Sequence, residues 1–417
     1  RGLGDVYKRQ VHDEGLHVNP VPTYAILGAT VHRTPNAEPG IETVLVRHGK
    51  IIDIGQEIEI PAGAKRIDAT GKHLYAGLID AYTDTSIDYV SDKGTSYWND
   101  KIRPQLKASQ EFKNANVDQA SMRSAGFTAA LVAPSQGIIK GQSSVMLLGD
   151  QVNEHSILKA DVAQHIRLTV SRGFCGGYPN SPMGAYALAR QVFMDADWYQ
   201  QAWSTANASA QSPTPETNDS LAALQTLIQG EQPAIIDSSN ELFVLRADRF
   251  AREFGIKAIV LGNGNEYRRI KEIAATGRTM ILPVNFAKAP DVSSPELARD
   301  VNLETLMHWD HAPANPARLA ENDVKFVFTS NGLKSKKDFL KQVRIAIERG
   351  LDKTLALEAM TTGPAELYGV SHLVGSIEKN KIANFTFTDG DIFDKKTKVT
   401  GVAIDGKLFL TDHRHLR

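Results

Sequence analysis

Residues 67–80 read IDATGKHLYAGLID, and they join two parts of the chain that differ in their pattern of apolar and turn residues. Before this stretch, short runs of strand-forming residues are separated by turn residues such as Gly49, Gly55 and Gly63, and no amphipathic helix is indicated. After it, short apolar runs alternate with amphipathic segments. Residues 67–80 therefore mark the passage from a small all-β region into an α/β region.

The α/β region is expected to contain parallel strands connected by helices. We expect strands at 78–82, 129–133, 234–236, 258–261, 280–284 and 325–329, and the clearest helices at 183–203, 241–254 and 338–349. Strands that alternate with helices indicate βαβ units and a parallel sheet. Over roughly 290 residues the natural closure is a (β/α)8 barrel of the TIM type, with an open doubly wound sheet as the alternative.

Short strand-like runs occur again after Gly369, at 376–377, 383–388 and 402–404. Because β segments flank the α/β core at both ends, we expect residues 11–73 and 369–417 to form one composite β-sandwich, with the barrel at 74–368. Residues 204–219, STANASAQSPTPETND, are polar and rich in Ser, Thr and Pro. This composition predicts a mobile surface insertion.

The composition is typical of a globular protein and points to neither a nucleic acid nor a membrane as partner. Of 417 residues, 42% are hydrophobic and 23% are charged, and the formal net charge is −1. A nucleic-acid-binding surface would be strongly basic, and no apolar run approaches the roughly 18 residues of a membrane-spanning helix. Cys175 is the single cysteine, which excludes an internal disulfide and leaves the compartment unknown.

Both ends of the chain read as cuts. The first ten residues, RGLGDVYKRQ, resemble translated sequencing-adapter read-through, so we leave residues 1–10 out of the fold prediction. On this interpretation the natural N-terminus is missing, and an exported or periplasmic origin stays open.

Two stretches resemble the amidohydrolase superfamily. Residues 67–80 resemble the superfamily's entry into the barrel, and residues 361–370 (TTGPAELYGV) with 375–385 (GSIEKNKIANF) resemble its exit. Residues 126–141, 172–199 and 309–319 are more specifically similar to the imidazolonepropionase-related amidohydrolases of bacteria. The resemblance implies a barrel with a composite β-sandwich, and hydrolysis of non-peptide carbon–nitrogen bonds of the cyclic amide or imidazolone type.

The resemblance also implies one or two divalent metal ions, held by a His-x-His pair, a Lys or Glu, two further His and an Asp that acts as general base. Here the assignable positions hold other residue types: Tyr82, Asp84, Asp237, Asn263 and Asn331. A neutral phenol is a poor ligand, and Asn cannot act as a base. We therefore expect these five residues to be vestigial metal-site positions, with Asn331 in place of the catalytic Asp.

The position after the fourth strand cannot be assigned from the sequence, and Lys140 is not an obvious substitute ligand. His308 and His311 are spaced i, i+3, which suits one helix face; a helix or loop role is favoured over metal ligation. Asp80, Asp84 and Asp88 alternate near the exit of the first barrel strand. For these carboxylates, solvation or pairing with a basic residue is favoured over weak binding of a hard cation.

The leading hypothesis is a degenerate amidohydrolase module without a tightly bound metal and with little or no hydrolase activity. It would work beside an intact amidohydrolase module, in tandem on the same chain or as another subunit. The alternative is a re-tooled enzyme, in which Asp84, Asp237 and His308 or His311 hold one Zn or Mn ion, or in which Tyr82 acts without metal. A third hypothesis is a sensor that binds a small molecule, as yet unknown, without turnover.

Overall fold

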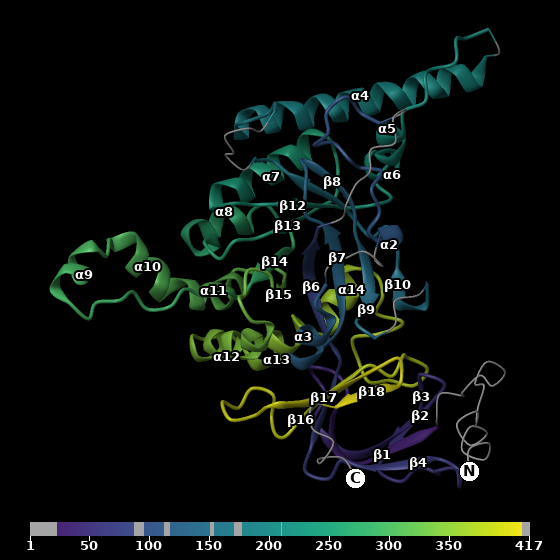
Figure 1. Ribbon diagram of the computed structural model, residues 1–417, viewed down its shortest axis with the longest axis vertical. Helices are drawn as coiled ribbons and strands as arrows, with labels where there is room; N and C mark the ends of the chain where they lie inside the picture. Colours follow the sequence, from purple (N-terminus) through teal and green to yellow (C-terminus); the bar gives the residue numbers. More distant parts are fainter. Residues whose placement is uncertain are drawn as a thin grey trace, which may run out of the picture.

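The strands of the computed structural model form three sheets, and most helices cover the α/β part of the molecule (Figure 1). The structure describes residues 23–86, 96–111, 117–150, 154–170, 177–209 and 211–410. Within these ranges, no helix combines the length and the apolar character that crossing a membrane requires.

Both ends of the chain contribute to one mixed sheet of eight strands. Its order is β18-β17-β16-β5-β1-β2-β3, with β4 beside β1. The bounds are β1 (Tyr24–His32), β2 (Gly40–Arg47), β3 (Lys50–Gly55), β4 (Lys65–Asp68), β5 (His73–Ala76), β16 (Phe385–Thr388), β17 (Val399–Ile404) and β18 (Lys407–Leu410). β16 pairs antiparallel with β5 and so joins the two flanks. The flanks therefore share a sheet with its own apolar core, whereas a two-layered sandwich stays a prediction.

The middle of the chain forms two further sheets, ordered β10-β9-β7-β6 and β15-β14-β13-β12-β11-β8. The bounds are β6 (Leu78–Thr85), β7 (Phe127–Pro134), β8 (Ile139–Gln142), β9 (Ser144–Leu147), β10 (Ile157–Lys159), β11 (Gln164–Arg167), β12 (Ala234–Asp237), β13 (Ala258–Leu261), β14 (Met280–Pro283) and β15 (Phe326–Thr329). Strands β11 to β15 are parallel. The α/β class is therefore confirmed.

The two sheets meet at two seams, because β6 lies beside β15 and β7 beside β8. Across both seams the ladder of strand pairs is interrupted within the described residues, so the ladder alone does not close a barrel. Strand β8 is antiparallel to β11, which departs from the all-parallel arrangement that the sequence predicts.

The helices follow the expected pattern with one correction. Their bounds are α2 (Ala108–Glu111), α3 (Gln119–Ser124), α4 (Pro182–Ala208), α5 (Asp219–Ala223), α6 (Gln225–Ile228), α7 (Glu241–Glu253), α8 (Ile270–Ala274), α9 (Pro295–Asp300), α10 (Leu303–His311), α11 (Asn315–Glu321), α12 (Phe339–Glu348), α13 (Lys353–Glu358) and α14 (Thr362–Leu367). As expected, Asn240 caps α7 by accepting from the backbone of Leu242 and Phe243. Residues 204–208 are helical rather than part of an insertion, because no Gly or Pro follows Gly184 until Pro213.

The buried carboxylate of Asp80 holds the seam between β6 and β15. It accepts hydrogen bonds from the backbone of Tyr82 at 3.3 Å, the hydroxyl of Thr83 at 3.3 Å, and both the backbone (3.1 Å) and hydroxyl of Ser330. A buried carboxylate needs such donors in place of water. The expectation that Asp80 is solvated or paired with a basic residue is wrong, because the side chain is fully buried and its described partners are neutral N–H and O–H donors. Asp88 lies outside the described residues.

Replacing Asp80 by Ala should lower the free energy of unfolding by about 3 kcal/mol, because several buried donors lose their acceptor. Urea denaturation measures this change. Asp84→Ala is the matched control, since Asp84 lies four residues later in β6 and is exposed, and this variant should stay within about 1 kcal/mol of the wild type. Equal losses in the two variants would contradict the role of Asp80.

Candidate functional site

Polar side chains from four strands gather toward the carboxyl ends of β11 and β12. His165 and Arg167 lie two residues apart on β11 and therefore point to the same face. Arg167 is opposite Asp237 in the β11–β12 ladder, while Lys140 comes from β8 and Tyr82 from β6. Parallel α/β sheets form their sites at this end of the strands, so we take these five residues as the candidate site.

Lys140 is the centre of the site. Its side chain is fully buried, and its Nζ lies 2.5 Å from Oδ2 of Asp237 and 3.3 Å from the hydroxyl of Tyr82. Nε of Arg167 donates to the same Oδ2 at 3.0 Å, from a side chain that is 30% exposed. One carboxylate is therefore shared by two cations, one buried and one reaching the surface.

Burial and neighbouring charges act in opposite directions at this site. Burial lowers the pKa of Lys140, although the charge of Asp237 opposes the shift. Burial by itself would raise the pKa of Asp237, but Lys140 and Arg167 outweigh that effect and hold it below its ordinary value. Burial raises the pKa of Tyr82 well above its ordinary value, and the negative charges of Asp237 and Asp84 add to the shift. At neutral pH the phenol therefore keeps its proton and the carboxylate stays charged.

His165 is a buried neutral imidazole beside these charges. Neither ring nitrogen has a hydrogen-bond partner among the described residues, and the ring centroid lies 5.6 Å from that of Tyr82. Burial lowers the pKa of His165 to about 3, and the Lys140 ammonium contributes in the same direction. In mild acid His165 therefore stays neutral in the folded protein, whereas the same imidazole would bind a proton in the unfolded chain.

The structure brings some of the predicted vestigial positions together. Tyr82 and Asp237 meet through Lys140, and exposed Asp84 lies near enough to act on the pKa of Tyr82. Asn263 instead belongs to a loop, where its backbone N–H donates to Glu266 at 2.7 Å. The backbone N–H of Asn331 donates to the Thr329 hydroxyl at 3.0 Å.

The candidate histidine ligands have other partners. His308 and His311 both lie on α10, where Nδ1 of His308 is 3.4 Å from the Tyr267 hydroxyl and Nδ1 of His311 is 3.1 Å from a guanidinium nitrogen of Arg318. In the described part of the chain, no three His, Cys, Asp or Glu side chains form a group that could hold a metal ion. Cys175 lies outside that part.

Sequence reasoning missed Lys140, His165 and Arg167 as members of the site. The available signal was weak: one lysine following Ile138-Ile139, and a polar alternation in the short segment Gln164–Arg167. Strand β11 has only four residues, which is too few for a two-residue period to stand out from a loop.

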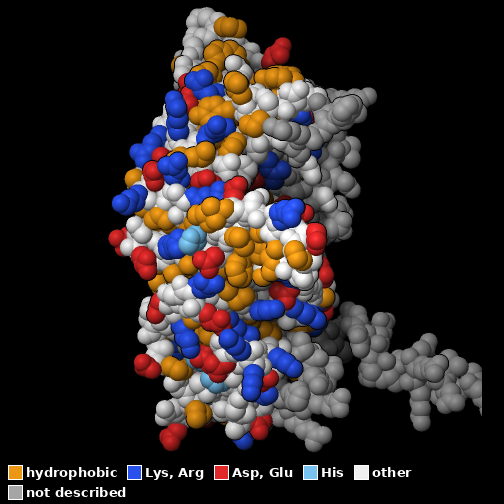
Figure 2. Space-filling model, turned by 90° about the vertical axis from the view of Figure 1, so that its left-hand side faces the viewer, with side chains coloured by type: hydrophobic (Ala, Val, Ile, Leu, Met, Phe, Trp, Pro, Cys, Tyr) orange, Lys and Arg blue, Asp and Glu red, His pale blue; other side chains and the backbone are white. Residues whose placement is uncertain are grey.

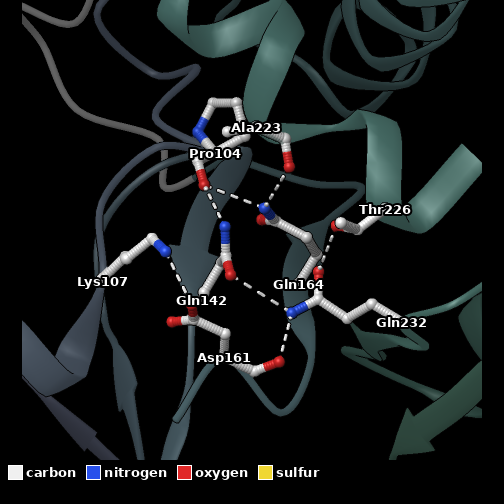
Figure 3. Close-up of polar contacts among 8 residues, drawn as sticks. All are labelled: Pro104, Lys107, Gln142, Asp161, Gln164, Ala223, Thr226 and Gln232. Carbon is white, nitrogen blue, oxygen red and sulfur yellow. Dashed lines mark hydrogen bonds and ion pairs between the residues drawn. The ribbon is translucent and has the colours of Figure 1, made fainter.

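A second polar cluster lies at the opposite ends of these strands (Figure 3). Nε2 of Gln164 donates to the carbonyl of Pro104 at 2.8 Å, and Nε2 of Gln232 donates to the carbonyl of Asp161 at 2.6 Å. Gln232 also donates to Oε1 of Gln142 at 3.3 Å. These amides bridge loops that are distant in sequence, so the cluster serves as a clamp at the amino ends of β11 and β12.

Comparison with known proteins agrees with this architecture. The model of the amidohydrolase family matches residues 309–409. The resemblance to the amidohydrolase superfamily is confirmed. The structure of an amidohydrolase from Thermotoga maritima MSB8 has a TM-score of 0.75 at 23% identity, over 93% of this chain and 100% of that chain.

More distant structures share the fold. A Xaa-Pro dipeptidase with bound methionine in its active site has a TM-score of 0.55 at 13% identity, over 93% of this chain and 100% of that chain. Molinate hydrolase has a TM-score of 0.52 at 14% identity, over 94% of this chain and 95% of that chain. No curated protein matches the chain. At these identities the structural likeness establishes the fold alone.

Of the five residues of the candidate site, only His165 and Asp237 have a free lone pair to offer the divalent metal that the superfamily implies, which is fewer than the three protein ligands of a catalytic zinc. A protonated amine and a guanidinium have no lone pair to offer, and the protonated phenol of Tyr82 is a poor ligand. The bonded oxygen of Asp237 is already shared by Lys140 and Arg167. A dication placed about 4 Å from one such cation would be repelled by on the order of 8 kcal/mol at an effective dielectric constant of 20.

Replacing Lys140 by Met should lower the free energy of unfolding by about 3 kcal/mol, because the buried Asp237 carboxylate loses its closest cation. Chemical denaturation measures the loss, and the double variant Lys140→Met/Asp237→Leu should recover part of it. Lys337→Met, at an exposed lysine, is the control and should be nearly neutral. A Lys140→Met protein as stable as the wild type would contradict the role given to the ion pair.

The stability of the protein should fall as the pH decreases below about 6.5, because the unfolded chain gains a proton on His165 that the folded chain does not bind until about pH 3. The folded pKa lies below the unfolded one, so this contribution is fully present above pH 6.5 and is lost progressively toward pH 3. Between about pH 6 and 5, the slope of unfolding free energy should be about 1 kcal/mol per pH unit shallower in His165→Phe. Equal slopes would show that His165 does not titrate as described.

Proposed function

We propose that this chain is an amidohydrolase-like module that carries a fixed cation, Lys140, in place of a catalytic metal, and that has little or no hydrolase activity. The observation that carries the proposal is the buried ion pair between Lys140 and Asp237, with Arg167 on the same carboxylate oxygen. The pair satisfies the charge of Asp237 from within the chain. A hydrolytic metal would have to displace it.

Hydrolysis needs two further functions, and the residues that replace the superfamily's metal and its catalytic Asp supply neither. A metal lowers the pKa of bound water and polarises the scissile carbonyl; the Lys140 ammonium has its donors directed at Asp237 and Tyr82. A general base must accept the proton of that water, and the amide of Asn331 cannot do so. The missing metal and the missing base would both act on the attacking water. Their joint loss favours a module without hydrolysis over a weak hydrolase.

We also propose that the two α/β sheets together represent the eight-stranded barrel of the superfamily. Strands β6, β7, β8 and β11 to β15 would follow one another around it, and the seams β6–β15 and β7–β8 support this order. The likeness to the Thermotoga maritima amidohydrolase supports the same interpretation. The flank sheet would then correspond to the composite β-sandwich.

The partner proposed for the module is an intact amidohydrolase module, in tandem or as another subunit, that acts on cyclic amides or related carbon–nitrogen bonds. This substrate class comes from the resemblance of residues 126–141, 172–199 and 309–319 to imidazolonepropionase-related enzymes. The re-tooled enzyme remains the alternative, with Asp84 and Asp237 as its acidic groups.

The decisive experiment is the metal content of the full chain, purified without chelators and dialysed against zinc or manganese. We expect less than about 0.1 metal ion per chain and no hydrolysis of a cyclic amide or a Xaa-Pro dipeptide, since the fixed cations oppose a dication. As a matched comparison, Tyr82→His/Asp84→His should stay metal-poor, whereas adding Lys140→Gln should increase zinc retention.

Stoichiometric metal in the wild-type chain would overturn the proposal. Turnover that disappears in Asp84→Asn would establish the re-tooled enzyme instead.

A further inference from the structure

An arm formed by residues 285–307 projects from the α/β part of the molecule (Figure 1). It contains α9 and most of α10, and none of its residues is buried. Helices as short as these are unstable in water unless an apolar face is covered. The arm therefore has the features of an element whose packing partner lies outside the chain that carries it.

The arm exposes a continuous apolar face. Leu303, Leu306 and Met307 are spaced i, i+3, i+4 on α10, which places them on one side of the helix. Leu303 is 71% exposed, and Val292 and Leu297 elsewhere on the arm are exposed as well. Figure 2 views the molecule from the side to which the arm projects, and hydrophobic side chains gather at mid-height on that face.

The base of the arm is fixed, so this face has a defined direction. Arg268 forms an ion pair with Glu304 at 2.9 Å, and the rings of Tyr267 and His308 stack with centroids 6.2 Å apart. Both contacts join α10 to the short helix at Glu266–Arg269. The arm is thus held away from the body rather than folded back onto it.

A groove between α4 and α7 has the complementary character. We call it the arginine groove; its lining includes Met183, Tyr186 and Leu245 with Arg190, Arg246 and Arg249. Its volume is about 1370 Å³, above the roughly 300–1,000 Å³ of pockets for small ligands. Met183 is 80% exposed at its edge. Such a groove suits a helical segment with an apolar face.

The charges of the two surfaces are opposite. Arg246 and Arg249 form no ion pair with any described residue, and neither do Glu296 and Asp300 on α9. The arm has four acidic residues, Asp291, Glu296, Asp300 and Glu304, against Lys288 and Arg299. Glu304 is already paired with Arg268 of the body, which leaves three acidic residues against two basic ones. Complementary charge of this kind steers association and fixes orientation.

We propose that the arginine groove binds the arm of a second copy of this chain. Because both surfaces belong to one chain, two copies can exchange arms about a twofold axis and form two identical contacts. The apolar face of α10 would cover Met183 and Leu245, and the acidic side of α9 would face Arg246 and Arg249. This inference does not depend on whether the module binds a metal.

Analytical ultracentrifugation of the full chain from about 1 to 100 μM tests the proposal, and a dimer is the expected species of the wild type. Leu303→Ser/Met307→Ser removes the apolar face of the arm, and Arg246→Glu/Arg249→Glu reverses the charge of the groove. Each double variant should raise the dissociation constant by about 30-fold or more. All these side chains are exposed or half-buried, so thermal unfolding should be close to that of the wild type.

Mixing the two double variants distinguishes this arrangement from any other dimer. The arm of the groove variant and the groove of the arm variant are both intact, so the mixture should form a heterodimer more stable than either variant alone. Ile41→Ser/Ile52→Ser, at exposed apolar residues of the flank sheet, is the control and should dimerise like the wild type.

A monomeric wild type at the highest concentration would overturn the proposal, as would dimers unaffected by either double variant. Loss of dimer in the arm variant alone would overturn the groove as its binding site. If the chain is monomeric and binds an intact amidohydrolase module through the arm and the arginine groove, the second copy is wrong as the partner and that module takes its place.

Discussion

The charge of Asp237 is the constraint on which the centre of the molecule depends. A carboxylate that deep in the protein needs a partner, because burying an unpaired charge costs several kcal/mol. Lys140 from β8 and Arg167 from β11 supply it, and in doing so they tie an antiparallel strand to the parallel ones. The ion pair therefore adds a side-chain link to the backbone ladder that pairs β8 with β11.

The two ends of the short strands β11 and β12 differ in the polar contacts that they make. At the amino ends, Gln142, Gln164 and Gln232 join loops through neutral amide hydrogen bonds (Figure 3). At the carboxyl ends the groups are charged, and His165 and one oxygen of Asp237 have no described partner. The amino ends are thus joined mainly by amide hydrogen bonds, although Oε1 of Gln164 has no described partner there either, whereas the carboxyl ends are joined by ion pairs.

The sequence predicted the parts of the fold that have a long or strongly apolar pattern. The β7, β12, β13 and β15 strands and the α7 and α12 helices lie where expected, because each has a clear period or an apolar run between turn residues. Strands β8 and β11 were missed because, unlike the equally short but apolar β13, they place Lys140, Gln164 and Arg167 inside the sheet. For the site, the resemblance to the superfamily located Tyr82 and Asp237. It could not identify Lys140 as the cation between them, because that contact joins strands that are distant in sequence.

An ammonium and a metal ion can balance the same carboxylate while having opposite consequences for chemistry. A metal ion keeps an open coordination position that activates water. Lys140 offers only N–H donors, and these are directed at Asp237 and Tyr82, so it balances charge without creating a nucleophile. Because the lysine cannot dissociate, the charge of Asp237 is balanced in every copy of the chain, whatever the supply of metal. The selection on such a module would then act on its packing and its surfaces, which makes the unburied arm and the arginine groove the features most in need of a functional explanation.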